Sequence, residues 1–380
     1  MGSKRTRLNI RKGFAKEQDE SIAVRQLAQQ IDQTDASVVV VFASSHYNLE
    51  RLGGKLQEAF QAPLIGCTTS GEITPDGYAQ GTLSGFSIAS DELRIDQFLI
   101  SSLHNLDSAR FEKTVSNIQD RLSQARKTTP EASAFGLLLI DGLSLMEEQI
   151  AAILANAVED VPIVGGSAGD DLKLEKTHIY SNGKFIPDAA LFTLFITTLP
   201  FASIKTQHFI ATDERLVITG ATPEKRLVQE INGRAAAEEY ARVVGMKPEQ
   251  LKHLVYFARP LMLRIGGEYF VRSIQKVNDD GSLTFFSAID EGLVMRIAER
   301  EDPVENLESA FNQIRRKIPE IKLTIGCDCI LRRLEIMDKM LEEPIDEIMK
   351  HYNVIGFNTY GEQFNSLHVN QTFTGIVLGE

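Results

Sequence analysis

The chain has 380 residues, of which 43% are apolar and 24% charged, and 40 Lys and Arg against 52 Asp and Glu give a net charge of −12. A prior of roughly 150 residues per domain predicts two or three domains. The negative charge argues against nucleic acid or an anionic membrane as the main partner. Three cysteines make no disulfide scaffold, and no apolar run approaches the ~20 residues of a membrane-spanning helix, so we expect a cytoplasmic protein.

The first 200 residues alternate between short apolar runs and segments with one apolar helical face. We expect strands at the runs and helices where apolar side chains recur every three to four residues. The predicted order is helix 22–31, strand 37–43, helix 48–60, strands 64–66, 83–88 and 93–100, helix 108–127, strand 134–140, a helix begun by the capping-box sequence 144–147, and strands 161–164, 177–180 and 189–197.

The sequence pattern changes after Pro200. The predicted order continues with strand 224–231, a helix near 236–244, a hairpin of strands 269–277 and 282–289, helix 303–316, strand 322–330, helices 333–341 and 345–351, and strand 372–378. Several strands are apolar on both faces, as in sheets that are covered by helices. We therefore expect a mixed α/β or α+β protein of two related halves, joined near residues 200–222.

A short glycine-containing sequence recurs along the chain. Residues 63–72 read Pro-Leu-Ile-Gly-Cys-Thr-Thr-Ser-Gly-Glu, and residues 353–362 read Asn-Val-Ile-Gly-Phe-Asn-Thr-Tyr-Gly-Glu. A looser copy that ends in Asp170 lies at 162–170. Each copy predicts a buried strand, a loop shaped by its second glycine, and a carboxylate at the far end of the loop. We expect repeated strand–helix–strand–glycine-loop–strand units whose loops build a binding site.

The glycine loops supply most of the candidate ligand-binding residues. Glu72, Glu362 and Asp170 could hold a ligand or act as general acids and bases, or each could cap N–H groups of its own loop. Arg272 and Arg332 could pair a ligand carboxylate in a bidentate manner, or could be solvated or internally paired. The candidate set is Gly66, Cys67, Thr68, Gly71, Glu72, Arg272, Arg332, Tyr360, Gly361 and Glu362.

Catalytic and metal-binding motifs have weaker support. The sequence Gly-Gly-Ser-Ala-Gly around Ser167 fits the nucleophile elbow of hydrolases, but residues 170–179 lack the helical face that must follow the elbow. A serine hydrolase is therefore the alternative, and we expect no catalytic residue. Cys327 and Cys329 share one strand face, yet zinc needs about four ligands, so buried, inert thiols are expected.

The repeated motifs resemble those of a known family. Residues 63–73 are similar to the signature of the FIST N domain, and the sequences at 329–332, 356–362 and 367–372 are similar to the FIST C domain. This resemblance extends from about residue 36 to the end of the chain.

The resemblance implies a division of the chain into three parts. They are an N-terminal extension at 1–35, a FIST N-like domain at 36–221 and a FIST C-like domain at 222–380.

The same resemblance implies a role in bacterial signal transduction. One bacterial branch of FIST proteins, of similar length to this chain, is similar to the nitric-oxide-sensing haemoproteins that act on histidine kinases. The expectation is a non-enzymatic sensor with a partner histidine kinase and non-covalent haem b, and the alternative is a haem-free sensor of an amino acid or another small metabolite. His368 is the first candidate for the axial ligand, followed by His46 and His178. The oligomeric state is left open.

Overall fold

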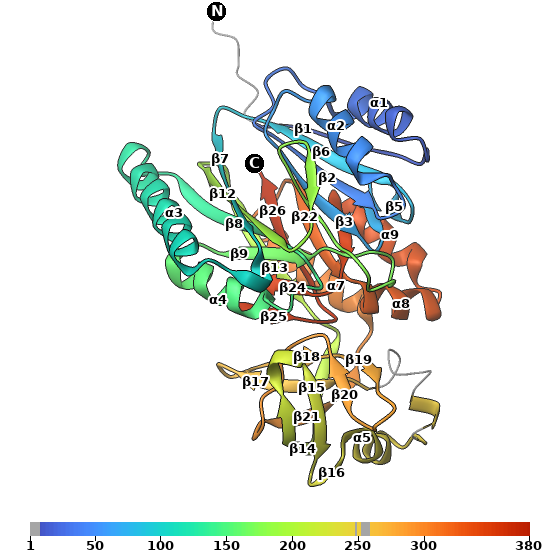
Figure 1. The fold of residues 1–380 in the computed structure, drawn as a ribbon. Coiled ribbons are helices and arrows are strands. Elements are labelled where there is room, and N and C mark those ends of the chain that lie inside the picture. Colours follow the sequence, from blue (N-terminus) through green and yellow to red (C-terminus); the bar gives the residue numbers. More distant parts are fainter. Residues whose placement is uncertain (1–7, 248, 252–258) are drawn as a thin grey trace, which may run out of the picture.

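The computed structural model describes residues 8–247, 249–251 and 259–380. The described residues form a mixed α/β fold of three six-stranded sheets and one eight-stranded sheet. Figure 1 shows the three six-stranded sheets together, with the eight-stranded sheet as a separate lobe below them. None of the described helices is long and apolar enough to cross a membrane.

The first sheet combines strands from the start of the chain with a hairpin from its middle. Its order is β1 (Asn9–Ala15), β6 (Leu83–Ala89), β2 (Val38–Ser44), β3 (Leu64–Thr69), β10 (Ile179–Ser181) and β11 (Lys184–Ile186). Helices α1 (Glu20–Ile31) and α2 (Leu49–Ala59) pack on Val39 and Val41 of its outer face. The sequence predicted both helices but missed β1, whose pairing with β6 places it in the sheet.

The second sheet has the same arrangement. Its order is β7 (Leu93–Ser101), β12 (Ala189–Thr197), β8 (Ser133–Ile140), β9 (Ile163–Ser167), β24 (Glu362–Phe364) and β25 (Leu367–Val369). The chain passes from β7 through the short helix η1 (Leu103–Asn105) into α3 (Ser108–Thr128), and α4 (Glu147–Ala157) joins β8 to β9. Both α helices pack on the outer face of the sheet, on Leu138 and Ile140 among others.

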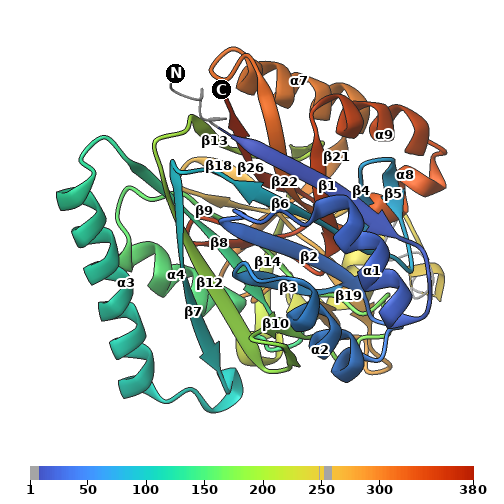
Figure 2. The ribbon, with the colours of Figure 1, turned by 90° about the horizontal axis from the view of Figure 1, so that it is seen from above.

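The third sheet completes the set. Its order is β13 (Phe201–Thr206), β26 (Phe373–Gly379), β22 (Ile321–Cys329), β23 (Val354–Thr359), β4 (Glu72–Thr74) and β5 (Gly77–Ala79). Helices α7 (Pro303–Arg315), α8 (Ile330–Asp338) and α9 (Glu342–His351) contribute to the apolar cluster on its outer face. Figure 2 shows the helices around the outside of the three sheets.

At one edge of each six-stranded sheet lies a hairpin that, along the chain, directly follows a strand of a different sheet. Hairpin β4–β5 follows β3 in the chain but pairs with β23. Hairpin β10–β11 follows β9 but pairs with β3, and β24–β25 follows β23 but pairs with β9. The three sheets are thus linked in a ring by exchanged hairpins. Strands of each predicted half therefore pair with strands of the other half. That the two halves resemble each other in structure stays a prediction.

The inner faces of the three sheets meet in one apolar core. Phe42 of β2 and Phe357 of β23 stack there with ring centroids 4.9 Å apart. Gly66, Gly165 and Gly356 occupy the middle of their strands, where an added Cβ would collide with a carbonyl oxygen of the neighbouring parallel strand. The first glycine of each repeated motif therefore serves close strand packing and does not end a strand as predicted.

The eight-stranded sheet is an insertion between β13 and α7, and we call residues 209–300 the insertion lobe. Its strands are β14 (Phe209–Thr222), β15 (Leu227–Ile231), β16 (Arg234–Ala235), β17 (Leu261–Ile265), β18 (Glu268–Arg272), β19 (Ile274–Val277), β20 (Leu283–Phe285) and β21 (Val294–Arg300). With α5 (Ala236–Val244) they enclose a separate apolar core. The predicted hairpin is confirmed as β19–β20, although the predicted strand 269–277 is interrupted at Ser273.

Candidate functional site

The loops that follow β3, β9 and β23 lie against one another. Backbone hydrogen bonds join each pair of loops, among them Ser70 N to Asn358 O (3.0 Å), Gly169 N to Thr68 O (3.1 Å) and Tyr360 N to Ser167 O (3.1 Å). Gly71 has a φ of +127°, so only glycine fits this turn without strain. Gly361 lies against the His368 ring, where a Cβ would collide with Cε1.

Glu72 and Glu362 are fully buried and are bound by donors of their own repeat. Glu72 accepts hydrogen bonds from the hydroxyl of Thr69, and from N (3.0 Å) and Oγ1 (2.7 Å) of Thr82. Glu362 has the equivalent partners in Thr359 and Thr372. Burial raises the pKa of Glu72 to about 7 and that of Glu362 to about 8. This geometry corresponds to the capping alternative.

Asp170 does not take the equivalent place in the second repeat. Glu72 lies opposite Phe357 in the third sheet. The equivalent place in the first sheet, opposite Cys67, is taken by Ile179 and not by Asp170. Asp170 instead accepts hydrogen bonds from the backbone N atoms of residues 174–176 at 2.8–2.9 Å, and one from the Tyr360 hydroxyl. Asp170 therefore orders the longer second loop, which corresponds to the capping alternative, and its place is not equivalent to those of Glu72 and Glu362.

Other candidate residues hold the exchanged hairpins. Arg332 is fully buried and donates to Asp328 at 2.9 Å, and the hydroxyl of Tyr78 in hairpin β4–β5 donates to the same carboxylate. Thr68 Oγ1 accepts a hydrogen bond from His178 N at 3.0 Å, next to hairpin β10–β11. Cys67 is a buried free thiol, and burial, together with neighbouring Cys327, raises its pKa well above the usual range.

The three candidate histidines lie in different surroundings. His368 is buried, with Nδ1 3.2 Å from Gln363 Nε2 and Nε2 3.2 Å from Phe286 O, and burial lowers its pKa. His46 is exposed, and its Nδ1 lies 2.9 Å from Ser44 Oγ. His178 is half-buried, and burial lowers its pKa as well.

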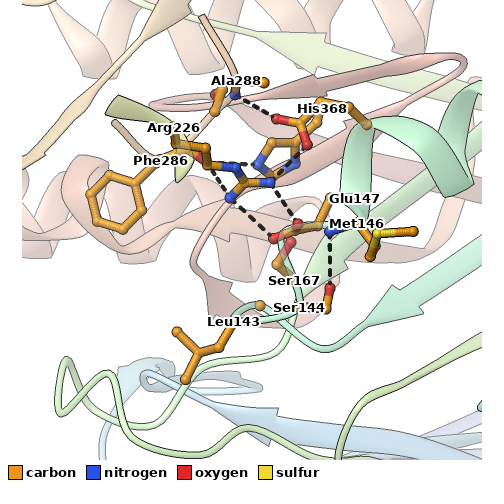
Figure 3. A network of polar contacts seen from close by, with 12 residues as sticks. Leu143, Ser144, Met146, Glu147, Ser167, Arg226, Phe286, Ala288 and His368 are labelled. Atoms are coloured by element: carbon orange, nitrogen blue, oxygen red, sulfur yellow. Dashed lines mark hydrogen bonds and ion pairs between the residues drawn. The ribbon is translucent and has the colours of Figure 1, made fainter. Parts of the chain in front are cut away.

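Buried charged groups meet where the insertion lobe contacts the core. We call Glu147, Glu148 and His368 of the core, with Arg226, Arg272 and Phe286 of the lobe, the interdomain polar cluster. Arg226 NH2 lies 2.6 Å from Glu147 Oε2 and 2.7 Å from Glu148 Oε2, and NH1 donates to Phe286 O at 2.7 Å. Figure 3 shows the Arg226 guanidinium facing Glu147, with Phe286 and His368 nearby. Burial opposes ionisation of Glu148, but neighbouring His368 and Arg226, together with the Ala288 N–H, hold its pKa well below the usual range.

The start of α4 explains how two carboxylates reach this cluster. The predicted capping box does not form, because the Ser144 hydroxyl donates to Asp141 O at 2.8 Å and the helix begins at Glu147. Leu145 adopts a left-handed conformation with a φ of 57° before the helix begins. The first turn of a helix favours negative side chains, and Glu147 and Glu148 occupy it while facing Arg226.

Further polar contacts connect the lobe to β25 and to the residues that follow it. Arg272 NH1 donates to His368 O at 3.2 Å, and Ser287 Oγ donates to Asn370 Oδ1 at 2.6 Å. Of the cluster, sequence reasoning had singled out Arg272 and His368 but missed Arg226. The acidic pair at 147–148 was a visible signal, yet its cationic partner lies 79 residues from Glu147.

Residues 37–234 match the FIST N domain, and residues 236–365 match the FIST C domain. The chain belongs to the FIST family. FIST domains are associated with sensing in signal transduction. The chain is also 22% identical to the uncharacterized protein MJ1623 of Methanocaldococcus jannaschii over 356 residues, which cover 83% of this chain and 67% of that protein.

The two FIST matches meet inside the insertion lobe. The first ends at residue 234 and the second begins at residue 236, at the start of α5. Both matches therefore contain part of the lobe and part of the core. The predicted division at 221/222 stays a prediction.

Ser167 lacks the surroundings of a nucleophile elbow in this FIST protein. It is the last residue of β9, and residues 168–178 form no helix. Its buried hydroxyl oxygen accepts a hydrogen bond from Gln363 Nε2 at 2.9 Å. A general base in hydrogen-bond reach is the first requirement for a serine nucleophile, and the amide of Gln363 is not one.

His368 does not fit the axial ligand of a haem. An axial ligand needs a free ring nitrogen and an open porphyrin-sized space, whereas both ring nitrogens of His368 are engaged in protein contacts. Within the described residues, hollows of about 640 and 590 Å³ lie along α7 and beside α1 and α2, and none of the three candidate histidines lines them.

Proposed function

We propose that this FIST protein is a ligand-binding sensor whose responsive element is the contact between the insertion lobe and the three-sheet core. The observation that carries the proposal is the charged character of this contact. The core and the lobe each have an apolar cluster of their own, and the contact between them combines the buried ion pairs of Arg226 with a small apolar cluster of Phe286, Leu331 and Tyr360. Polar contacts between domains resemble transient interfaces, for which relative movement is the default expectation.

The connections of the lobe are compatible with such movement. The chain enters the lobe after β13 and leaves it before α7, and a backbone hydrogen bond from Glu301 N to His208 O (2.8 Å) joins the two crossings. A ligand that binds preferentially to one arrangement of lobe and core shifts the population toward that arrangement. The changed surface then acts on a partner, for which the family resemblance suggests a histidine kinase.

Amide hydrogen exchange tests the proposal. We expect Arg226→Ala to accelerate exchange at 143–148 and 286–288 more strongly than at the amides of β2, β8 and β22. Arg264→Ala, at an exposed position of the lobe, is the matched control. Unchanged exchange at both segments in Arg226→Ala would contradict a contact that depends on Arg226.

A panel of small metabolites then tests for ligand sensing. A ligand should raise the melting temperature, slow exchange at the same two segments and change the autophosphorylation of a partner histidine kinase. Compounds that stabilise the wild type without changing either segment would argue against the contact as the responsive element.

We propose a haem-free sensor of a small metabolite in preference to the haem-dependent nitric oxide sensor, because both ring nitrogens of His368 are engaged. The visible absorption spectrum of protein prepared with haem decides between them. A featureless spectrum supports the haem-free form. An intense Soret band that shifts with nitric oxide would restore the haem protein, and His368→Ala and His46→Ala would then be compared.

The repeated units are also part of this proposal. The three six-stranded sheets share one strand order, each with a preceding strand at one edge and an exchanged hairpin at the other. We infer that residues 36–90 and 321–379 are repeats that superpose strand by strand. In such a ring only the third unit carries an insertion, which makes one side of the core different from the other two.

A further inference from the structure

Arg272, at the end of β18, is a buried cation without a carboxylate at ion-pair distance among the described residues. Its side chain is 5% exposed, and NH1 donates to the carbonyl oxygens of Val271 and His368, each at 3.2 Å. Its Nε is buried and has no hydrogen-bond partner. A buried guanidinium that lacks its counter-ion destabilises the folded state, because desolvation is not offset by a direct ion pair.

A second unsatisfied group lies on the other side of His368. Gln363 Nε2 contacts His368 Nδ1, while Gln363 Oε1 is buried without a partner. Arg272 and Gln363 therefore contact the same residue from the lobe and from the core, and each keeps an unused polar atom. Buried polar groups without partners call for an explanation. A bound acceptor is one for the Arg272 donor, whereas Gln363 Oε1 is itself an acceptor and needs a donor.

We propose that Arg272 anchors a binding site for a small monocarboxylate between the insertion lobe and hairpin β24–β25. The flat guanidinium presents Nε and a terminal N–H as a pair of parallel donors, which matches the two oxygens of a carboxylate. Glu147 and Glu148 already pair with Arg226, and their charges disfavour a dianion such as phosphate. The site thus takes a single negative charge.

The site rests on the proposed function, because it lies in the contact proposed to respond to ligand. Arg272 now donates across the contact to His368 O. A carboxylate bound to Arg272 replaces or supplements this donor contact and supplies the missing counter-ion. Binding therefore changes the bonds that join the lobe to the core.

Arg272→Met tests the site with a side chain of similar length and no charge. We expect the variant without ligand to melt at a higher temperature than the wild type, since an unpaired buried charge is removed. Sodium acetate and sodium propionate should raise the melting temperature of the wild type in a saturable manner, relative to sodium chloride at equal ionic strength. Arg272→Met should lose this response, and titration calorimetry should show affinity for propionate at least about tenfold weaker.

Two further variants sharpen the comparison. Arg272→Lys keeps the charge without the paired donors, and we expect weakened carboxylate binding. Arg264→Met removes an exposed arginine of the same lobe and should keep the wild-type response. A lower melting temperature of Arg272→Met, equal carboxylate binding by wild type and Arg272→Met, or a response to inorganic phosphate alone would each overturn the proposal.

The outcomes separate this inference from the proposed function. If Arg226→Ala accelerates exchange at the contact but carboxylates have no effect that depends on Arg272, the carboxylate site is wrong and the responsive contact stands. If carboxylates bind through Arg272 but exchange at 143–148 and 286–288 never changes, the site is right and the responsive contact is wrong.

Discussion

Arg226 and His368 lie next to the same acceptor, the carbonyl oxygen of Phe286, at 2.7 and 3.2 Å. Arg226 and Phe286 belong to the insertion lobe, and His368 belongs to hairpin β24–β25 of the core. Because a carbonyl is only an acceptor, His368 Nε2 must carry a proton, and neutral His368 then accepts from Gln363 at Nδ1. One backbone oxygen thereby fixes the tautomer of a buried histidine and the position of a buried arginine.

Removing Arg226 should strongly destabilise the protein. Glu147 is 1% exposed, and Arg226→Ala would leave its carboxylate buried without its cation. We expect a loss of about 3–5 kcal/mol in the free energy of unfolding, measured by urea denaturation. The exposed pair of Lys55 and Glu58 is the control, because Lys55→Ala should cost less than about 1 kcal/mol. Equal losses in both variants would contradict the special role of Arg226.

Glu72 and Glu362 should make the protein less stable as the pH rises. Their pKa values are raised from an ordinary 4.5 to about 7 and about 8, so between these values the folded state holds protons that the unfolded state has released. This contribution is complete below pH 4.5 and is lost as the pH passes through the folded pKa values. Each pH unit between the unfolded and the folded pKa corresponds to about 1.4 kcal/mol of stability.

The matching variants are Glu72→Gln and Glu362→Gln, since glutamine resembles the protonated acid. Urea denaturation at pH 5 and pH 9 should show a smaller fall in stability with pH for each variant than for the wild type. Parallel pH profiles of wild type and variants would show that neither carboxyl carries a raised pKa. A loss of ligand binding at constant stability would instead restore these residues as ligand contacts.

The exchanged hairpin β4–β5 should depend on the hydroxyl of Tyr78. Asp328 is fully buried and accepts from both Tyr78 and Arg332, so Tyr78→Phe removes one donor to a buried carboxylate. We expect a loss of roughly 1–3 kcal/mol and faster amide exchange in β4 and β5. Tyr352→Phe, whose hydroxyl bonds the neutral amide of Asn312 at 3.1 Å, should cost less. A Tyr78→Phe variant as stable as the wild type would show that the Tyr78 hydroxyl does not hold this hairpin.

Ser167→Ala should leave any esterase background unchanged. The hydroxyl oxygen of Ser167 accepts from Gln363 and is buried, so it lacks the base and the access that catalysis requires. Hydrolysis of p-nitrophenyl acetate measures the background before and after the substitution. Robust turnover that disappears in the variant would support the serine hydrolase alternative.

Local sequence signals predicted much of the secondary structure, because capping and apolar periodicity act between neighbouring residues. Asn48 caps α2 by accepting from Arg51 N at 3.1 Å, and Pro303 stands in the first turn of α7. The hairpin β19–β20 has its turn at Asn278–Gly281, where the sequence placed it. The same motifs were sufficient to suggest the FIST family, which the matches at 37–234 and 236–365 show.

Only the tertiary structure decided how these pieces combine. The exchange of hairpins, the edge strand β1 and the contact of Arg226 with Glu147 all join segments that are distant in the sequence. Whether Glu72 caps a loop or binds a ligand also depends on Thr82, ten residues away, and on complete burial. Periodicity records which face of an element is apolar, but the partner of a buried charge is set by packing, since desolvation makes only a nearby partner effective.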